Sequence, residues 1–243
     1  MGEKSALVGC IKPTRHSGSH ADLVRLLPAG IRTEARRLNI VHGTIGEFEA
    51  VMADYEVEVA RFAAEGVDLI HPEGTPPFML KGLAGERAIV ARWQDAHGVP
   101  VFTSAMSQAE AMRALGIHRF IGVGYDFEDT EIVARYFRDA GFDVLALDRP
   151  RTTAWEDIDN LPSARVFDLI VELARRHPQA EGVYIQGSKW RVLDIVERLE
   201  GELGIPVVHP VTARCWYMQK STSIERPLAG HGRLLAALPA FSA

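Results

Sequence analysis

The chain contains the same kind of segment twice, and this internal repeat limits the possible folds more than any other feature. One copy starts at Ala64-Glu-Gly-Val, runs through a loop and a helix, and reaches Gly98-Val-Pro-Val. The other starts at Ala180-Glu-Gly-Val and reaches Gly204-Ile-Pro-Val-Val in the same way. Short apolar runs bounded by turns indicate buried strands, and longer amphipathic runs indicate helices. Each copy is therefore predicted as strand, loop, helix, strand and helix, and the repeat predicts two similar α/β units.

A glycine-containing loop follows the buried strand in each copy. In the first copy the strand 67–70 leads to Gly74 and Thr75, and in the second the loop holds Gly187 and Ser188. Glycine lets the backbone turn and approach a ligand closely, and α/β sheets bind ligands beyond the carboxyl ends of their strands. The repeat predicts that the two loops face each other across a cleft, a favoured place for a ligand. The alternative is an ordinary strand-to-helix loop.

The rest of the chain alternates strands and helices, which predicts parallel sheets with helices on both faces. Thr44 is placed to cap the helix 46–64, whose apolar stripe includes Phe48, Tyr55 and Phe62. We expect one unit formed by 1–103 plus 211–243 and a second formed by 104–210. The expected strands include 6–11, 38–41, 67–70, 99–103, 119–125, 142–147 and 204–208. The expected helices include 46–64, 85–96, 104–115, 126–140, 163–176 and 212–218.

Composition narrows the class of protein. With 243 residues, 47% of them hydrophobic, the chain can bury a sizeable core. A net charge of −5 argues against nucleic acid as a partner, and the scattered Lys and Arg indicate solvated helix faces. The two cysteines, Cys10 and Cys215, predict neither a disulfide framework nor a zinc site and fit a reducing cytoplasm. The sequence shows no signal segment, membrane helix, G-x-G-x-x-G motif or P-loop, so we expect neither a membrane nor a nucleotide partner.

The order of these motifs resembles that of the Asp/Glu racemase superfamily, in particular the branch of arylmalonate decarboxylase and maleate cis–trans isomerase. The resemblance covers nearly the whole chain and includes Pro13, Gly74-Thr75, Tyr125, Gly187-Ser188 and the strand 204–208. It implies two α/β domains of the aspartate racemase type with the site between them. It also implies chemistry at a carbon next to a carboxylate, without metal or cofactor.

The chain departs from this resemblance at the two loop cysteines that the superfamily typically uses. Gly74 stands in the first loop, as in the decarboxylase, but Gly187 stands where the second loop would offer a cysteine. Cys10 lies within a predicted strand, and Cys215 lies near a helix start, where its pKa could be lowered. Neither a two-cysteine racemase nor an isomerase with a loop cysteine as nucleophile fits this pattern.

The groups that would bind substrate are retained better. By resemblance, Thr75 and Tyr125 supply hydroxyls to an enediolate, while Ser188 and Lys189 supply backbone N–H groups from the second loop. Pro76 removes one further donor of the first loop. The remaining candidates are Pro13 and Thr14, which follow the first strand, and Trp155 and Trp190, which could line an apolar wall.

A proton carrier must replace the missing thiols. We rank Glu73 first, because a carboxyl buried in a cleft can have its pKa raised towards neutrality. Lys189 is second, as an acid or as the ligand of a second carboxylate, and His209 is third. His71, Glu73 and His209 could in principle hold a metal ion, but the resemblance implies none, so we expect no metal.

Three functions stay open at the level of the sequence. The first is a cofactor-free lyase or isomerase that stabilises an enediolate of a small carboxylate or dicarboxylate, as in decarboxylation of a malonate or isomerisation of a maleate. The second is a hydrolase or hydratase on the same scaffold, with Glu73 or His209 activating water. The third is a carboxylate-binding protein without catalysis. A homo-oligomer is possible in each case.

Overall fold

The computed structural model describes residues 4–14, 18–125, 129, 131–150, 161–187 and 189–242. Its first half contains β1 (Ala6–Lys12), α1 (Gly18–Leu26), β2 (Ile31–Arg37), α2 (Ile45–Ala64), β3 (Leu69–Pro72), α3 (Thr75–Met79), α4 (Gly82–His97) and α5 (Ser104–Ala114). Its second half contains β4 (Arg119–Val123), α6 (Ile132–Asp139), β5 (Asp143–Asp148), α7 (Ser163–Arg176), β6 (Gly182–Ile185), η2 (Leu193–Ile195), α8 (Val196–Leu203), β7 (Val207–Val208), α9 (Pro210–Thr222) and α10 (Arg233–Ala237).

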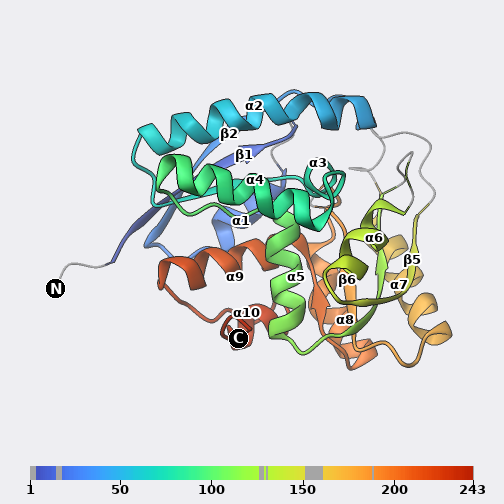
Figure 1. The fold of residues 1–243 in the computed structure, drawn as a ribbon. Helices are drawn as coiled ribbons and strands as arrows, with labels where there is room; N and C mark the ends of the chain where they lie inside the picture. The colour runs from blue at the N-terminus through green and yellow to red at the C-terminus, as the bar shows by residue number, and fades with distance from the viewer. Residues whose placement is uncertain are drawn as a thin grey trace.

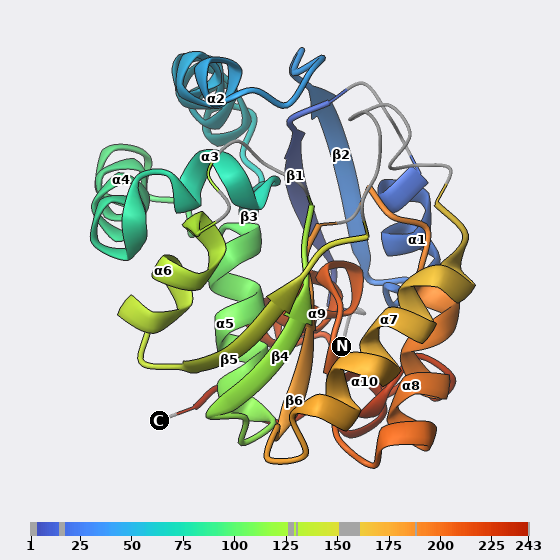
Figure 2. The same cartoon turned by 90° about the vertical axis from the view of Figure 1, so that its right-hand side faces the viewer.

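The strands form two parallel sheets, which confirms the predicted α/β class with two pseudo-symmetric units (Figure 2). The first sheet has the order β2-β1-β3, and the second has the order β5-β4-β6-β7. A single bridge between Ile70 and Val101 extends the first sheet where β7 extends the second. The same hydrogen bond follows the last paired residues of β3 and β6. The Glu73 N–H donates to the Ile11 carbonyl of β1, and the Gln186 N–H donates to the Val123 carbonyl of β4. Glu73 and Gln186 therefore occupy equivalent positions in the two units.

Local sequence signals account for the helix ends. Thr44 caps α2 through a capping box, in which its hydroxyl accepts from the Glu47 N–H and the Glu47 carboxylate accepts from the Thr44 N–H. The predicted apolar stripe of this helix is buried, with Met52 at its edge. Gly98 and Gly204 end α4 and α8 in the left-handed conformation, with φ of 68° and 72°.

Helices α5 and α9 pack against each other between the two sheets (Figure 1). Helix α9 also contacts α1 of the first half, and α5 also contacts β7 of the second. The larger core continues from the second sheet through these helices to one face of the first sheet. A second core lies between the first sheet and helices α2 and α4. The unit bounds 1–103 plus 211–243 and 104–210 stay a prediction.

Several predicted elements were wrong in place or kind. Residues 38–41 form no strand; the second strand is β2, and residues 38–41 follow it with Leu38 and Ile40 buried. Strand 99–103 reduces to the bridge at Val101, and strand 67–70 is shifted to β3. The Pro76-Pro77 stretch begins helix α3 rather than continuing a loop, because proline fits the first turn of a helix.

None of the helices in the described ranges combines the length and the apolar character that crossing a bilayer requires.

Candidate active site

Three charged side chains are buried together beyond the carboxyl ends of β1 and β3. Lys12 ends β1, Glu73 follows β3, and Arg214 reaches them from α9. One Glu73 oxygen, Oε2, lies 3.1 Å from Lys12 Nζ and 2.5 Å from Arg214 Nη1. The three side chains are at most 3% exposed. We name Lys12, Glu73 and Arg214 the charged cluster; it carries two positive charges and one negative.

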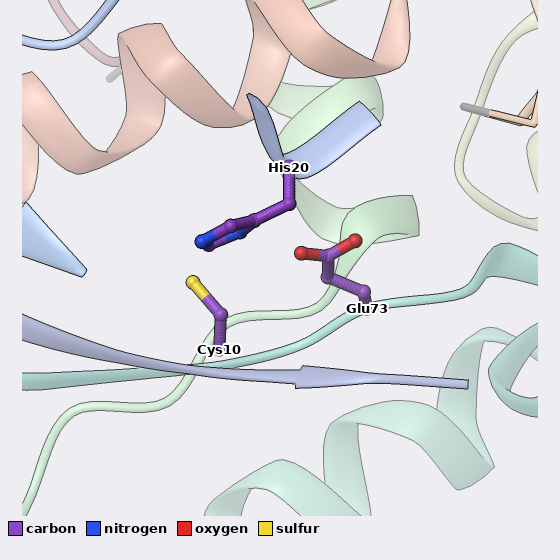
Figure 3. Close-up of side chains that lie close together, drawn as sticks. All are labelled: Cys10, His20 and Glu73. Carbon is purple, nitrogen blue, oxygen red and sulfur yellow. The ribbon is translucent and has the colours of Figure 1, made fainter. Parts of the chain in front are cut away.

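Residues of α1 and β1 complete the surroundings of this cluster. The Ser19 hydroxyl accepts from Lys12 Nζ at 3.1 Å, and the Ser19 carbonyl accepts from Arg214 Nη2 at 2.9 Å. Figure 3 shows the Cys10 thiol, the His20 ring and the Glu73 carboxylate turned towards one another. One ligand atom of each lies within 4.8 Å of the others. A sulfur, a nitrogen and an oxygen at this spacing form a set that could in principle hold zinc.

The pKa of Glu73 is shifted in the direction opposite to our prediction. Burial alone would raise it, but Arg214 and Lys12 outweigh burial and hold the pKa of this carboxyl well below its usual range. Glu73 is therefore ionised at neutral pH and is not a carboxylic acid waiting to donate a proton. Its contacts make it the group that holds Lys12 and Arg214 in place.

Two buried histidines, His71 and His209, adopt opposite neutral tautomers. His71 Nδ1 lies 3.0 Å from the Phe102 carbonyl, which can only accept, so Nδ1 carries the proton and Nε2 bears a lone pair. His209 Nδ1 accepts from the Val211 N–H, so its proton is assigned to Nε2. Both Nε2 atoms are buried and have no hydrogen-bond partner within the described residues. Burial lowers the pKa of His71 to about 4 and that of His209 to about 3, so both rings are neutral at pH 7.

The first loop brings Gly74 and Thr75 next to Glu73. Gly74 has a φ of 102°, which an L-residue rarely adopts, and its N–H donates to the Ser104 hydroxyl at 3.2 Å. The Thr75 hydroxyl is buried, and no described residue bonds it. An unsatisfied hydroxyl inside a protein calls for an explanation such as a water or a ligand.

Tyr125, which follows β4, packs its ring against Gly187 of the second loop. A Cβ placed on Gly187 would be 2.2 Å from atoms of that ring. The Tyr125 hydroxyl accepts from the Lys189 backbone N–H at 2.7 Å, and the ring packs edge-on against Trp190. Tyr125 thus fills the space that a side chain at position 187 would need.

Neither cysteine has the properties of an activated nucleophile. Cys215 lies in the middle of α9, not at its start, and burial raises its pKa to about 11, so the expected lowering was wrong. Burial and the neighbouring Glu73 also raise the pKa of Cys10 well above its usual range. Both are therefore neutral thiols at pH 7.

The other predicted site residues are placed only in part. Ser188 and Trp155 lie outside the described residues. Pro13 and Thr14 follow β1 and are half-buried, and the Pro13 carbonyl accepts from the Ile40 N–H. Their roles, and those of Lys189 and Trp190 in binding substrate, stay predictions.

Sequence reasoning assigned no role to Lys12 or Arg214. The scattered Lys and Arg were expected on solvated helix faces, whereas Lys12 and Arg214 are both buried. In both cases the neighbouring residues in the sequence indicate burial. Lys12 directly continues the buried run 8–11, and Arg214 stands in a helix whose neighbours Ala213, Cys215 and Trp216 are apolar.

Comparison with known proteins gives the fold first. The maleate isomerase Iso of Pseudomonas putida superposes with a TM-score of 0.86 at 20% identity, covering 97% of this chain and all of the other. A cysteine-to-serine mutant of Nocardia farcinica maleate cis–trans isomerase, with a covalently bound succinylcysteine intermediate, gives 0.84 at 20% identity, with 96% and 98% covered. These likenesses show that the chain has the same two-sheet α/β fold as the two maleate isomerases.

The sequence comparison is more specific. The family model described as arylmalonate decarboxylase matches residues 8–235, and the chain therefore belongs to the arylmalonate decarboxylase family. Arylmalonate decarboxylase of Bordetella bronchiseptica is 24% identical over 229 residues, covering 93% of this chain and 95% of that protein.

Proposed function

We propose that this protein is a cofactor-independent lyase or isomerase that stabilises the enediolate of a small carboxylate. Membership of the arylmalonate decarboxylase family supports this reaction class. The structural observation that carries the proposal is the buried Thr75 hydroxyl, which has no partner among the described residues. Family membership gives no support to hydrolysis or hydration by Glu73 or His209.

The proposed chemistry places negative charge beside Thr75. Loss of CO2 from a malonate, or addition to and rotation of a maleate, leaves electrons on the carbon next to a carboxylate, and that carboxylate becomes an enediolate. Hydroxyls that are already oriented where this charge develops stabilise it without reorganisation. We assign that role to Thr75 and Tyr125.

Decarboxylation fits the described residues better than an isomerisation through cysteine. The Nocardia farcinica structure holds its intermediate on a cysteine, whereas both thiols of this chain are neutral and buried and both loops carry glycine. Decarboxylation needs no nucleophile, because CO2 leaves and one proton then adds to the same carbon. Lys189 and His209 are the candidates for supplying that proton, and Glu73 is reassigned to holding Lys12 and Arg214.

The test is proton NMR in D2O with methyl-, phenyl- and hydroxymalonate, maleate, aspartate and glutamate. We expect deuterium at an α-carbon, with loss of CO2 or a cis-to-trans change. Thr75→Val should slow turnover by about 100-fold, since one donor to a developing oxyanion contributes roughly 3 kcal/mol. It should not lower the melting temperature, because the hydroxyl it removes has no protein partner in the described structure.

Thr75→Ser is the matched control, because it keeps the hydroxyl and should retain most of the turnover. Unchanged turnover in Thr75→Val would remove Thr75 from the mechanism. Unchanged spectra with every compound, or oxygen from labelled water in the product, would contradict the proposed reaction class.

A further inference from the structure

We propose that Lys12 and Arg214, held by Glu73, bind a second anionic group of the substrate, separate from the carboxylate that becomes the enediolate. This inference rests on the proposed function and adds a substrate class to it. The substrate would carry a carboxylate or a comparable anion on the carbon chain in place of a neutral substituent.

The charge balance of the cluster is the first support. Lys12 and Arg214 are both paired with one oxygen of Glu73, and Glu73 is the carboxylate that contacts either of them among the described residues. One positive charge is left over in a region where the side chains are at most 3% exposed. Burying an uncompensated charge is costly. An anionic ligand group would balance it.

Two unsatisfied buried donors point the same way, while one acceptor, Glu73 Oε1, also has no partner among the described residues. Arg214 Nε is buried with no acceptor in the described part of the chain, although Arg214 is only 1% exposed. The Thr75 hydroxyl has no partner there either. Since Glu73 and Thr75 are two residues apart, their Cα atoms lie within about 7 Å. A small molecule with two anionic groups could therefore reach both.

The pseudo-symmetry shows that the fold itself does not require these charges. Glu73 and Gln186 are equivalent, because their N–H groups make the same bond to the adjacent strand. Lys12 and Gly124 are equivalent as well, because each directly follows the strand residue that accepts this bond. In the second unit the carboxylate is thus replaced by a neutral amide and the lysine by a glycine.

The third charge is also absent from the second unit. Arg214 and Gln108 each stand five residues after the N-cap of their helix, which is His209 in α9 and Thr103 in α5. Gln108 bonds the Ile185 carbonyl at 3.3 Å. The same strand and helix geometry is therefore built with neutral residues in one unit and with charged residues in the other. This asymmetry favours a role in binding over a role in folding.

The reaction restricts which anionic group can sit at the cluster. Two cations on the carboxylate that leaves as CO2 would stabilise the ground state and slow its loss. The bound group must therefore be one that survives the reaction. For a decarboxylase this indicates a malonate with an anionic substituent, such as ethane-1,1,2-tricarboxylate, whose product would be succinate.

The alternative to an anionic ligand is a metal ion bound by Cys10, His20 and Glu73. It would place further positive charge beside the two cations that already contact Glu73. It would also have to displace the proton of the Cys10 thiol, whose pKa is raised by burial and by Glu73. The charge of the cluster therefore favours an anion.

The test measures equilibrium binding of succinate and butyrate by titration calorimetry. These ligands have the same number of carbons and differ by one carboxylate. We expect the wild type to bind succinate at least about tenfold more tightly than butyrate. In Arg214→Met a neutral Lys12–Glu73 pair remains, and the ratio should fall to within about threefold. Glu73→Gln removes the negative charge, so its ratio should equal or exceed that of the wild type.

Lys12→Met is the second variant, which leaves the Arg214–Glu73 pair and should also lose the preference, so the test does not depend on the folding of one protein. An equal affinity of the wild type for both ligands, or an unchanged ratio in Arg214→Met and Lys12→Met, would overturn the inference. Zinc binding that is abolished by Cys10→Ala would favour the metal reading instead and also overturn it.

The two proposals can fail separately. Charge-dependent succinate binding without turnover of any malonate would leave the subsite standing and contradict the decarboxylase. Faster turnover of ethylmalonate than of ethane-1,1,2-tricarboxylate would leave the decarboxylase standing and contradict the subsite.

Discussion

Gly187 is a position at which the surrounding packing leaves no room for a side chain. The Tyr125 ring occupies the space where a side chain at 187 would lie, and φ of Gly187 is 70°. A thiol at this position would have to displace Tyr125 and also accept a left-handed backbone. The glycine at position 187 and the placement of Tyr125 therefore depend on each other.

The corresponding prediction compares Gly187→Ala with Gly66→Ala. Both glycines have a left-handed backbone, with φ of 70° and 76°, but Gly66 has open space where its Cβ would lie. Gly66→Ala should lower the free energy of unfolding by about 1 kcal/mol from backbone strain alone. Gly187→Ala should cost about 1–3 kcal/mol more, because it also overpacks against the ring. Urea denaturation measures both, and an equal loss would contradict the clash with Tyr125.

Helix α9 is the element that joins the site to the core. His209 caps its N-terminus, Arg214 reaches the charged cluster from its second turn, and Trp216 packs into the core. Thr103 caps α5 at the equivalent position with a hydroxyl. An imidazole used as a cap must keep Nδ1 unprotonated, which makes the start of α9 sensitive to acid.

We therefore predict a pH-dependent contribution of His209 to stability. Its pKa is lowered in the folded state to about 3, below the ordinary value of about 6.5, so the unfolded chain binds a proton first as pH falls. Stability from this residue is complete above pH 6.5 and declines as the pH falls from there towards 3. Between about pH 6 and pH 4, His209→Asn should remove about 1.4 kcal/mol per pH unit of the wild-type slope.

His209→Ala supplies the control for capping. Asparagine keeps an N-cap acceptor and alanine does not, so the alanine variant should be about 1 kcal/mol less stable than the asparagine variant at pH 7. Urea denaturation from pH 7 to pH 4 gives both values. The same slope in His209→Asn as in the wild type would mean that other groups bind the proton.

For the whole molecule, a buried carboxyl joins the two halves. Glu86 of α4 accepts hydrogen bonds from the hydroxyls of Thr103, which precedes α5, and Tyr136 of α6. Burial raises the pKa of Glu86 in spite of these two donors. The contact crosses from a helix of the first half to a helix of the second.

Tyr136→Phe should lower the free energy of unfolding by about 1–3 kcal/mol, because a buried carboxyl loses one of its donors. Tyr217→Phe is the matched control, since no hydrogen bond of its hydroxyl is found in the described ranges, and it should cost less than about 0.5 kcal/mol. Thermal and urea denaturation measure the difference. Equal effects of the two changes would show that Glu86 does not depend on Tyr136.

Much of the architecture could be predicted from the order of residues. Apolar runs, the Thr44 capping signal and the glycines after α4 and α8 act over a few residues, so α2, α4, α5 and α7 were predicted nearly at their observed bounds. The repeat of the Ala-Glu-Gly-Val segments predicted the two pseudo-symmetric units. The error at residues 38–41 arose because Leu38 and Ile40 are buried without belonging to a strand.

The sequence by itself determined the class of fold, the two loops and the absence of a loop thiol, because these follow from local pattern and residue identity. Only the tertiary structure decided which charges meet. Lys12, Glu73 and Arg214 are far apart in the chain and converge because two parallel strands end beside α9. That convergence reversed the predicted shift in the pKa of Glu73, since the electrostatic energy of a buried group depends on the charges packed around it.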